Sequence, residues 1–130
     1  MEKHFVDSVK VKTANVEYAD GIVIVRVLPD SEVDLEEAKN TISAILKLTR
    51  GEKYLLLIDK RELKDVSPKA TKYYSSKEVT QHIIANAIFV GSISTRLIAN
   101  FFIRFNKPAV PVKLFTSESE ALQWLKEFKK

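Results

Sequence analysis

The stretch between Asn86 and Thr116 constrains the fold of this chain more than any other part of the sequence. It contains a short apolar run, Ala87–Val90, then an amphipathic segment, Ser94–Phe105, and after a Lys-Pro-Ala-Val-Pro break a second apolar run, Val112–Phe115. Short apolar runs bounded by turn residues are typical of buried strands, and apolar residues at helical spacing are typical of amphipathic helices. The stretch therefore predicts a strand–helix–strand unit of an α/β domain.

The residues before this unit predict a hairpin and a helix. Val9–Glu17 and Ile22–Leu28 are strand-like, and the Asp-Gly pair between them favours a tight turn. Asp34 and Glu37 have the spacing of a capping box, which indicates where the helix begins. Gly51 is expected to end the helix, because glycine readily takes the left-handed conformation that is common there.

Two further helices and a strand complete the pattern. Tyr54–Ile58 is an unbroken apolar run, which predicts a strand covered on both faces, as in the middle of a parallel sheet. Ser67 precedes a proline and is expected to open a less regular helix that runs towards Ile84. Ser117 and Glu120 repeat the capping-box spacing and predict a closing helix.

This order of elements predicts one α/β domain over residues 1–130. Its 130 residues, of which 45% are hydrophobic, are enough to bury a single core. The N-terminal β-hairpin and the repeated αβ units that follow predict a five-stranded mixed, mostly parallel sheet with one antiparallel edge strand and four helices.

Composition limits the location and the partners of the protein. The chain has no cysteine, which excludes disulfides and thiolate metal sites and favours the cytoplasm. No segment approaches the roughly 20 apolar residues of a membrane helix, so we expect no membrane span. The formal net charge is +4, but the basic residues are dispersed along the chain, so nucleic acid is not a predicted partner.

Several segments in the second half of the chain resemble the C-terminal half of the small bacterial STAS-like domains. They are Ala87–Ser92, Arg96–Phe102, Lys107-Pro108, Pro111-Val112, Phe115-Thr116 and Glu120–Leu125. Such domains are related in fold to anti-sigma-factor antagonists and are grouped loosely with lipid-binding SEC14-type domains. The resemblance implies a STAS-like fold for the whole chain.

The better-known STAS proteins bind a partner protein under the control of a phosphorylatable serine. That serine follows an Asp at the end of the strand that corresponds here to Lys53–Asp59. This chain keeps Asp59, but the next three residues are Lys-Arg-Glu, and the nearest hydroxyl downstream belongs to Ser67. The resemblance therefore does not carry the phosphorylation switch over to this chain.

A candidate anion site is predicted where the carboxyl ends of two strands meet the start of the helix after Ser92. Helix N-termini present free amides and a partial positive charge, and parallel sheets bind ligands beyond the carboxyl ends of their strands. The candidate ligand-binding residues are Asp59, Lys60, Arg61, Gly91, Ser92, Ser94 and Arg96. The alternative is that Ser92 or Ser94 is only an N-cap and that the charged residues simply end a strand.

The sequence predicts no catalytic residue, metal ligand or cofactor. His4 and His82 lack the spacing of a metal site or a catalytic triad, and with three glycines the chain has no Gly-rich nucleotide loop. The apolar stripe of the helix before Lys107 is expected to face the core rather than a lipid pocket. That stripe consists of Leu97, Ile98, Phe101, Phe102 and Phe105.

These observations favour a non-catalytic signalling or protein-interaction module with an unknown protein partner. The alternative is a small-ligand carrier or sensor that binds an anion or a lipid. We also expect a homodimer, because helices shared unevenly between the two faces of an apolar sheet would leave a patch for another copy to cover.

Overall fold

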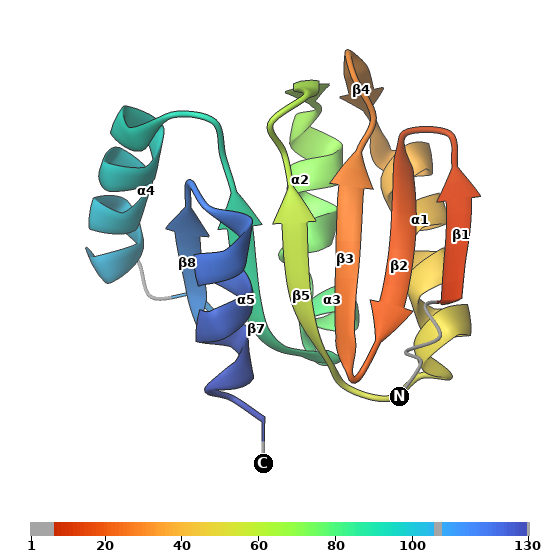
Figure 1. The fold of residues 1–130 in the computed structure, drawn as a ribbon. Helices are drawn as coiled ribbons and strands as arrows, with labels where there is room; N and C mark the ends of the chain where they lie inside the picture. Colours follow the sequence, from red (N-terminus) through yellow and green to blue (C-terminus); the bar gives the residue numbers. More distant parts are fainter. Residues whose placement is uncertain (1–6, 106–107, 130) are drawn as a thin grey trace.

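The computed structural model describes residues 7–105 and 108–129, and a mixed sheet lies at its centre (Figure 1). Its six strands lie in the order β1-β2-β3-β5-β7-β8. The first three are antiparallel neighbours, and β3, β5, β7 and β8 are parallel. The strands are β1 (Asp7–Val11), β2 (Ala14–Ala19), β3 (Ile22–Val27), β5 (Tyr54–Asp59), β7 (Ile83–Phe89) and β8 (Val112–Phe115). A second, two-stranded parallel sheet pairs β4 (Ser31–Val33) with β6 (Leu63–Val66).

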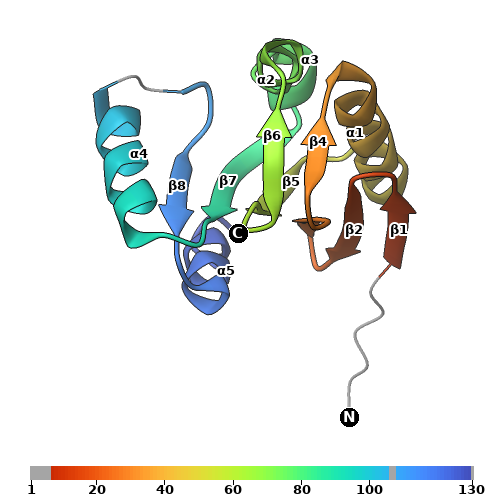
Figure 2. The same ribbon diagram turned by 90° about the horizontal axis from the view of Figure 1, so that it is seen from above.

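The helices lie on both faces of the six-stranded sheet and beyond one of its edges. Within the described residues they are α1 (Leu35–Thr49), α2 (Pro68–Tyr74), α3 (Lys77–Thr80), α4 (Ile93–Phe105) and α5 (Glu118–Lys126). Seen from above, α1, α2 and α3 lie on one face, α5 lies on the other, and α4 lies at the outer edge, next to β8 (Figure 2). The expected α/β fold with a mostly parallel sheet is confirmed.

The N-terminal hairpin is in fact a three-stranded meander. The predicted strand Val9–Glu17 is interrupted by a turn at Lys12 and Thr13, which separates β1 from β2. The turn is held by tertiary contacts, because the carbonyl oxygen of Thr13 accepts hydrogen bonds from the Leu28 amide and the Ser31 hydroxyl. The main sheet consequently has six strands rather than five. It contains two antiparallel strand pairs, β1–β2 and β2–β3, rather than one.

The segment from Ser67 to Ile84 also differs from its prediction as one helix. Ser67 caps α2 as expected, since its Oγ accepts the Ala70 amide at 3.1 Å. The helix then ends, and the Ser76 hydroxyl donates to the Tyr73 carbonyl at 2.6 Å before the short α3 begins. Strand β7 already starts at Ile83, where alternating burial replaces the helical pattern. The described residues therefore contain five helices instead of four.

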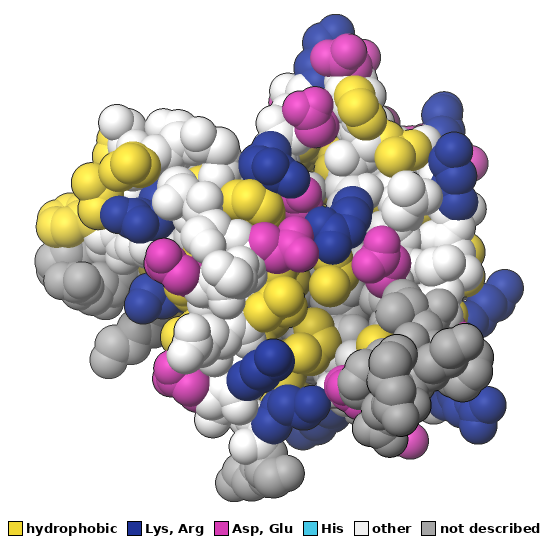
Figure 3. Space-filling model, viewed as in Figure 1, with side chains coloured by type: hydrophobic (Ala, Val, Ile, Leu, Met, Phe, Trp, Pro, Cys, Tyr) yellow, Lys and Arg dark blue, Asp and Glu magenta, His cyan; other side chains and the backbone are white. Residues whose placement is uncertain are grey.

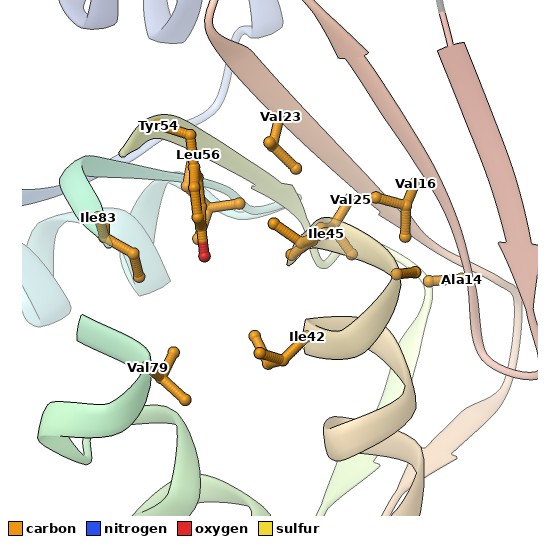
Figure 4. Packing of buried hydrophobic residues seen from close by; sticks show 11 residues of the cluster. Ala14, Val16, Val23, Val25, Ile42, Ile45, Tyr54, Leu56, Val79 and Ile83 are labelled. Atoms are coloured by element: carbon orange, nitrogen blue, oxygen red, sulfur yellow. The ribbon is translucent and has the colours of Figure 1, made fainter. Parts of the chain in front are cut away.

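A hydrophobic core forms on each face of the six-stranded sheet, and a smaller cluster of Val33, Ala38 and Ala70 lies beside the two-stranded sheet. Leu55 and Leu57 of β5 point into the core under α5, whereas Tyr54 and Leu56 point into the core under α1, α2 and α3 (Figure 4). All four side chains are at most 4% exposed. This arrangement confirms the prediction that the run is covered on both faces, because alternate strand residues point to opposite sides.

The boundaries of α1 follow from its sequence. Asp34 Oδ1 accepts the Leu35 amide at 2.8 Å, while Glu37 Oε1 accepts the Asp34 amide at 2.9 Å, so the capping box is formed. At the other end Arg50 and Gly51 both have positive φ values, 57° and 77°. Glycine takes this conformation without steric cost, which lets the chain turn back into β5.

Candidate functional site

A network of charged side chains lies at the carboxyl ends of β3 and β5. Arg26 of β3 makes two hydrogen bonds to Glu118 at the start of α5, at 2.8 and 3.2 Å, and its Nε lies 3.4 Å from Glu17. The hydrogen bond from Arg26 holds the pKa of the Glu118 carboxyl below its ordinary value. These hydrogen bonds connect α5 to β3. In Figure 3 basic and acidic side chains alternate across the middle of this face.

Asp59 is the most buried member of this network, at 7% exposure. Its carboxylate accepts two hydrogen bonds from the Arg61 guanidinium, at 3.0 and 2.8 Å, and Arg26 lies 3.9 Å away. Burial raises the pKa of Asp59, but the hydrogen bonds from Arg61 and the charges of both arginines outweigh burial and leave the pKa below its ordinary value. The Arg61 guanidinium also stacks on the Phe89 ring, 4.1 Å from its centroid.

The network is therefore internally paired. Its three carboxylates, Glu17, Asp59 and Glu118, outnumber its two guanidiniums, so at neutral pH it does not offer the positive charge that an anion needs. Arg61 and Asp59 mainly fix each other and the end of β5. This arrangement favours the alternative interpretation, in which the charged residues mark the end of a strand and do not bind a ligand.

The structure divides the seven predicted site residues among three places. Asp59 and Arg61 lie together, and Gly91 lies beside them, because a Cβ added to Gly91 would be 3.9 Å from Arg61 Cγ. Lys60 lies on the opposite face of the sheet, where it lines a cavity under α1, α2 and α3. The expectation that Lys60 would join Asp59 and Arg61 is wrong, because the alternation of side chains between the two faces of β5 continues into Lys60, the residue after its end.

The other three residues belong to α4. Ser92 Oγ accepts the Thr95 amide at 3.2 Å, which is the bond of an N-cap, and Ser94 is exposed in the first turn. Arg96 is half-buried and lines a groove between α4 and β8, together with Lys113 and Glu120. Binding of an anion at Ser92, Ser94 and Arg96 stays a prediction, with one of the helix-start amides already hydrogen-bonded to Ser92.

Replacing Ser92 by alanine is expected to lower the free energy of unfolding by about 1 kcal/mol, because the Thr95 amide loses its acceptor. Ser94→Ala is the matched control and should change it by less than about 0.5 kcal/mol, since Ser94 is exposed. Urea denaturation measures both. A phosphate titration followed at the amides of residues 91–96 by NMR tests the anion site separately, and an absence of shifts at millimolar phosphate would exclude it.

Helix α4 is attached to the sheet through polar groups. Asn100 Nδ2 donates to the Leu114 carbonyl at 3.2 Å, and the Leu114 amide donates to Asn100 Oδ1 at 2.9 Å. Among the side chains of α4 that the structure describes, Arg96, Ala99 and Ile103 are also half-buried. Because Leu114 lies in an edge strand, Asn100 satisfies backbone groups that have no neighbouring strand on that side.

Four large apolar side chains of α4 are exposed to solvent. Ile93, Leu97, Ile98 and Phe101 are between 57% and 60% exposed. The prediction that the stripe forms core is therefore wrong for Leu97, Ile98 and Phe101, while the side chains of Phe102 and Phe105 lie outside the described ones. Figure 3 shows hydrophobic side chains gathered at the end of the molecule where α4 lies. We call Ile93, Leu97, Ile98 and Phe101 the α4 face.

A groove of about 400 Å³ runs beside the α4 face, between α4 and β8. Leu97 and Phe101 form part of its wall, so the ridge of the helix and the groove share residues. Arg96, Lys113 and Glu120 supply charges of both signs to the groove. The sequence could have suggested this arrangement only through Asn100 and Arg96, which are polar residues on the side of the helix that turns to the sheet.

The described residues offer no arrangement typical of catalysis by a metal. They contain no group of three His, Cys, Asp or Glu side chains that could hold a metal ion. In the same residues, no helix has the length and apolar character needed to cross a membrane.

Comparison with known proteins places this fold among described families. Residues 16–129 match the model of a family described as Domain of unknown function (DUF7793), and no curated protein matches the chain. The chain is similar to the crystal structure of an uncharacterized protein of the DUF3478 family with a SpoIIAA-like fold, from Shewanella loihica PV-4. The two share 15% identity and a TM-score of 0.64, over 96% of this chain and 97% of that one. This likeness shows a SpoIIAA-like fold, in agreement with the resemblance to STAS-like domains.

Proposed function

The chain belongs to the family described as Domain of unknown function (DUF7793), and from this premise we propose that it is a non-catalytic protein-interaction module whose docking surface is the α4 face. The observation that carries the proposal is the exposure of four large apolar side chains on one helix. Soluble proteins rarely expose contiguous apolar patches, and those that they keep commonly mark interaction sites.

The way α4 is held supports this role. Asn100 fixes the helix to Leu114 by two hydrogen bonds, and neither involves the four side chains of the α4 face. Among the described side chains of α4, the polar Arg96 and Asn100 are half-buried while Ile93, Leu97, Ile98 and Phe101 are exposed. Such an arrangement leaves the apolar face available to another molecule.

The occupant that the surface fits is a second copy of the chain. A two-fold interface is self-complementary, so the same patch must supply both a projecting and a receiving part. Here the ridge of Ile93, Leu97 and Ile98 lies beside the groove between α4 and β8. The groove also carries both cations and an acid, so Arg96 or Lys113 of one copy can lie opposite Glu120 of the other.

The expected dimer is weak. Complete burial of one such side chain contributes about 1.5–3 kcal/mol. Because these side chains are already partly covered in the monomer, burying the rest of each one on association contributes about 1 kcal/mol. Four from each copy give roughly 8 kcal/mol before the cost of association is subtracted. The module is therefore expected to associate only at high protein concentration, which suits a regulated contact.

Sedimentation equilibrium from about 10 µM to 1 mM tests the proposal. We expect a concentration-dependent dimer, and Ile98→Glu should weaken it more than about tenfold, because a carboxylate would be buried in an apolar interface. Ser43→Glu, on an exposed position of α1, adds the same charge far from α4 and should leave the dimer unchanged.

Two results would overturn the proposal. A monomer at every concentration would exclude the second copy as the occupant of the α4 face. A dimer that is insensitive to Ile98→Glu would place the contact on another surface.

A further inference from the structure

A cavity of about 230 Å³ lies between the sheet and the helices α1, α2 and α3. Its walls are mostly apolar, and Figure 4 shows Ile42, Leu56, Val79 and Ile83 directed into the space between sheet and helices. This cavity has the volume of roughly eight waters, yet its apolar walls offer those waters few hydrogen-bond partners.

A half-buried cation, Lys60, stands at one end of the cavity. Lys60 follows the last residue of β5, and its side chain lines the cavity with Leu63 and Val66 of β6. Among the residues that the structure describes, no carboxylate pairs with the Lys60 ammonium. Burial lowers the pKa of this ammonium, which indicates that its charge lacks a partner.

An unsatisfied acceptor lies further along the same cavity. Asn86 Oδ1 is buried without a hydrogen-bond partner, and Asn86 lines the cavity from β7. Buried polar atoms without partners are rare in folded proteins, and each calls for an explanation such as a missing ligand or water. Asn86 pairs in register with Leu56, four residues before Lys60, so the two polar positions are separated by about 13 Å along the strands.

We infer that the cavity binds a medium-chain carboxylate, with the carboxylate on Lys60 and the hydrocarbon chain between the sheet and α1, α2 and α3. The apolar walls suit a hydrocarbon chain, the Lys60 ammonium suits a carboxylate, and a cavity of about 230 Å³ limits the ligand to a short or medium chain. A hydroxyl on the chain would in addition satisfy Asn86 Oδ1. This site is independent of the α4 face, none of whose residues lines the cavity.

Titrations with octanoate, three analogues that each change one feature and a hydroxylated derivative test the ligand class. Octanoate carries both the charge and the chain, octanol lacks the charge, octylamine reverses it, and acetate lacks the chain. We expect octanoate to bind most tightly and to shift the NMR signals of Leu56, Val79 and Asn86, and 8-hydroxyoctanoate to bind more tightly still. Octylamine and acetate should cause no shifts at these residues.

Lys60→Met separates the charge from the cavity. It is expected to weaken octanoate binding at least about tenfold, as the loss of a hydrogen bond to a charged group does, while leaving octanol binding unchanged. Lys64→Met is the matched control, because Lys64 is exposed on β6 and does not line the cavity. Val79→Phe should fill the cavity and weaken both probes, with a thermal melt to show that this variant is folded.

Three outcomes would overturn the inference. They are an absence of shifts with millimolar octanoate, shifts confined to the α4 face, and octylamine binding as tight as that of octanoate. The second outcome would indicate adsorption to an exposed apolar surface. None depends on whether the protein forms a dimer, so the failure of this inference and that of the proposed docking function can be told apart.

Discussion

Replacing Leu57 by alanine is expected to lower the free energy of unfolding by about 3–4 kcal/mol. Leu57 is fully buried in β5, where it packs in the core under α5 with Leu55 and Leu125. Truncation removes three carbon atoms from a closely packed site in the middle of the sheet, and the rigid strands on both sides prevent the cavity from collapsing. Urea denaturation at neutral pH measures the change.

Leu97→Ala is the matched control for this experiment. It makes the same chemical change on the α4 face, where Leu97 is 57% exposed. Its effect should stay within about 0.5–1 kcal/mol, because a half-exposed leucine loses little burial. A loss at Leu97 as large as that at Leu57 would show that α4 packs into a core and that its apolar side chains are not available for docking.

Replacing Arg26 by methionine is expected to lower the free energy of unfolding by about 2 kcal/mol at pH 7. The change leaves Glu118 without its two hydrogen bonds and leaves Asp59, which is 7% exposed, with Arg61 as its remaining cation. Lys64→Met removes an exposed ion pair with Glu32 and should change the free energy by less than about 0.5 kcal/mol.

The same variant should alter how stability depends on pH. In the wild type the pKa values of Asp59 and Glu118 are both lowered in the folded state. Their contribution is therefore fully present above the ordinary carboxyl pKa values, near 4, and is lost as the pH falls through the lower folded-state values. Arg26→Met should flatten this acid-side loss. Unfolding curves from pH 7 to pH 2 that fall equally steeply in both proteins would contradict this account of the network.

Local sequence patterns were sufficient to predict the elements whose ends are set by neighbouring residues. Strand β8 coincides with the predicted run Val112–Phe115, and α1 begins at the capping box of Asp34 and Glu37. Turns held by distant residues could not be found in this way. The break at Thr13 has no glycine or proline, and it forms because Leu28 and Ser31 donate to the Thr13 carbonyl.

The candidate site shows the same limit. The alternation of side chains along a strand was enough to predict that Lys60 would point away from Asp59 and Arg61, and this signal was missed. The cavity that Lys60 lines depends on how α2 and α3 pack over the sheet, which no local pattern determines. The stripe of α4 likewise has the same spacing whether it faces a sheet or solvent, so only the structure could show its exposure.

The side-chain amide of Asn100 has a consequence for how copies of this protein can meet. By donating to and accepting from Leu114, it imitates one residue of a further strand at the outer edge of β8. An incoming strand from another molecule would need the same two backbone groups, so continuous β-pairing across molecules is blocked there while α4 stays in place. Loss of the Asn100 amide would leave these two backbone groups of an edge strand without their partner, which is the condition under which an edge can pair with another chain.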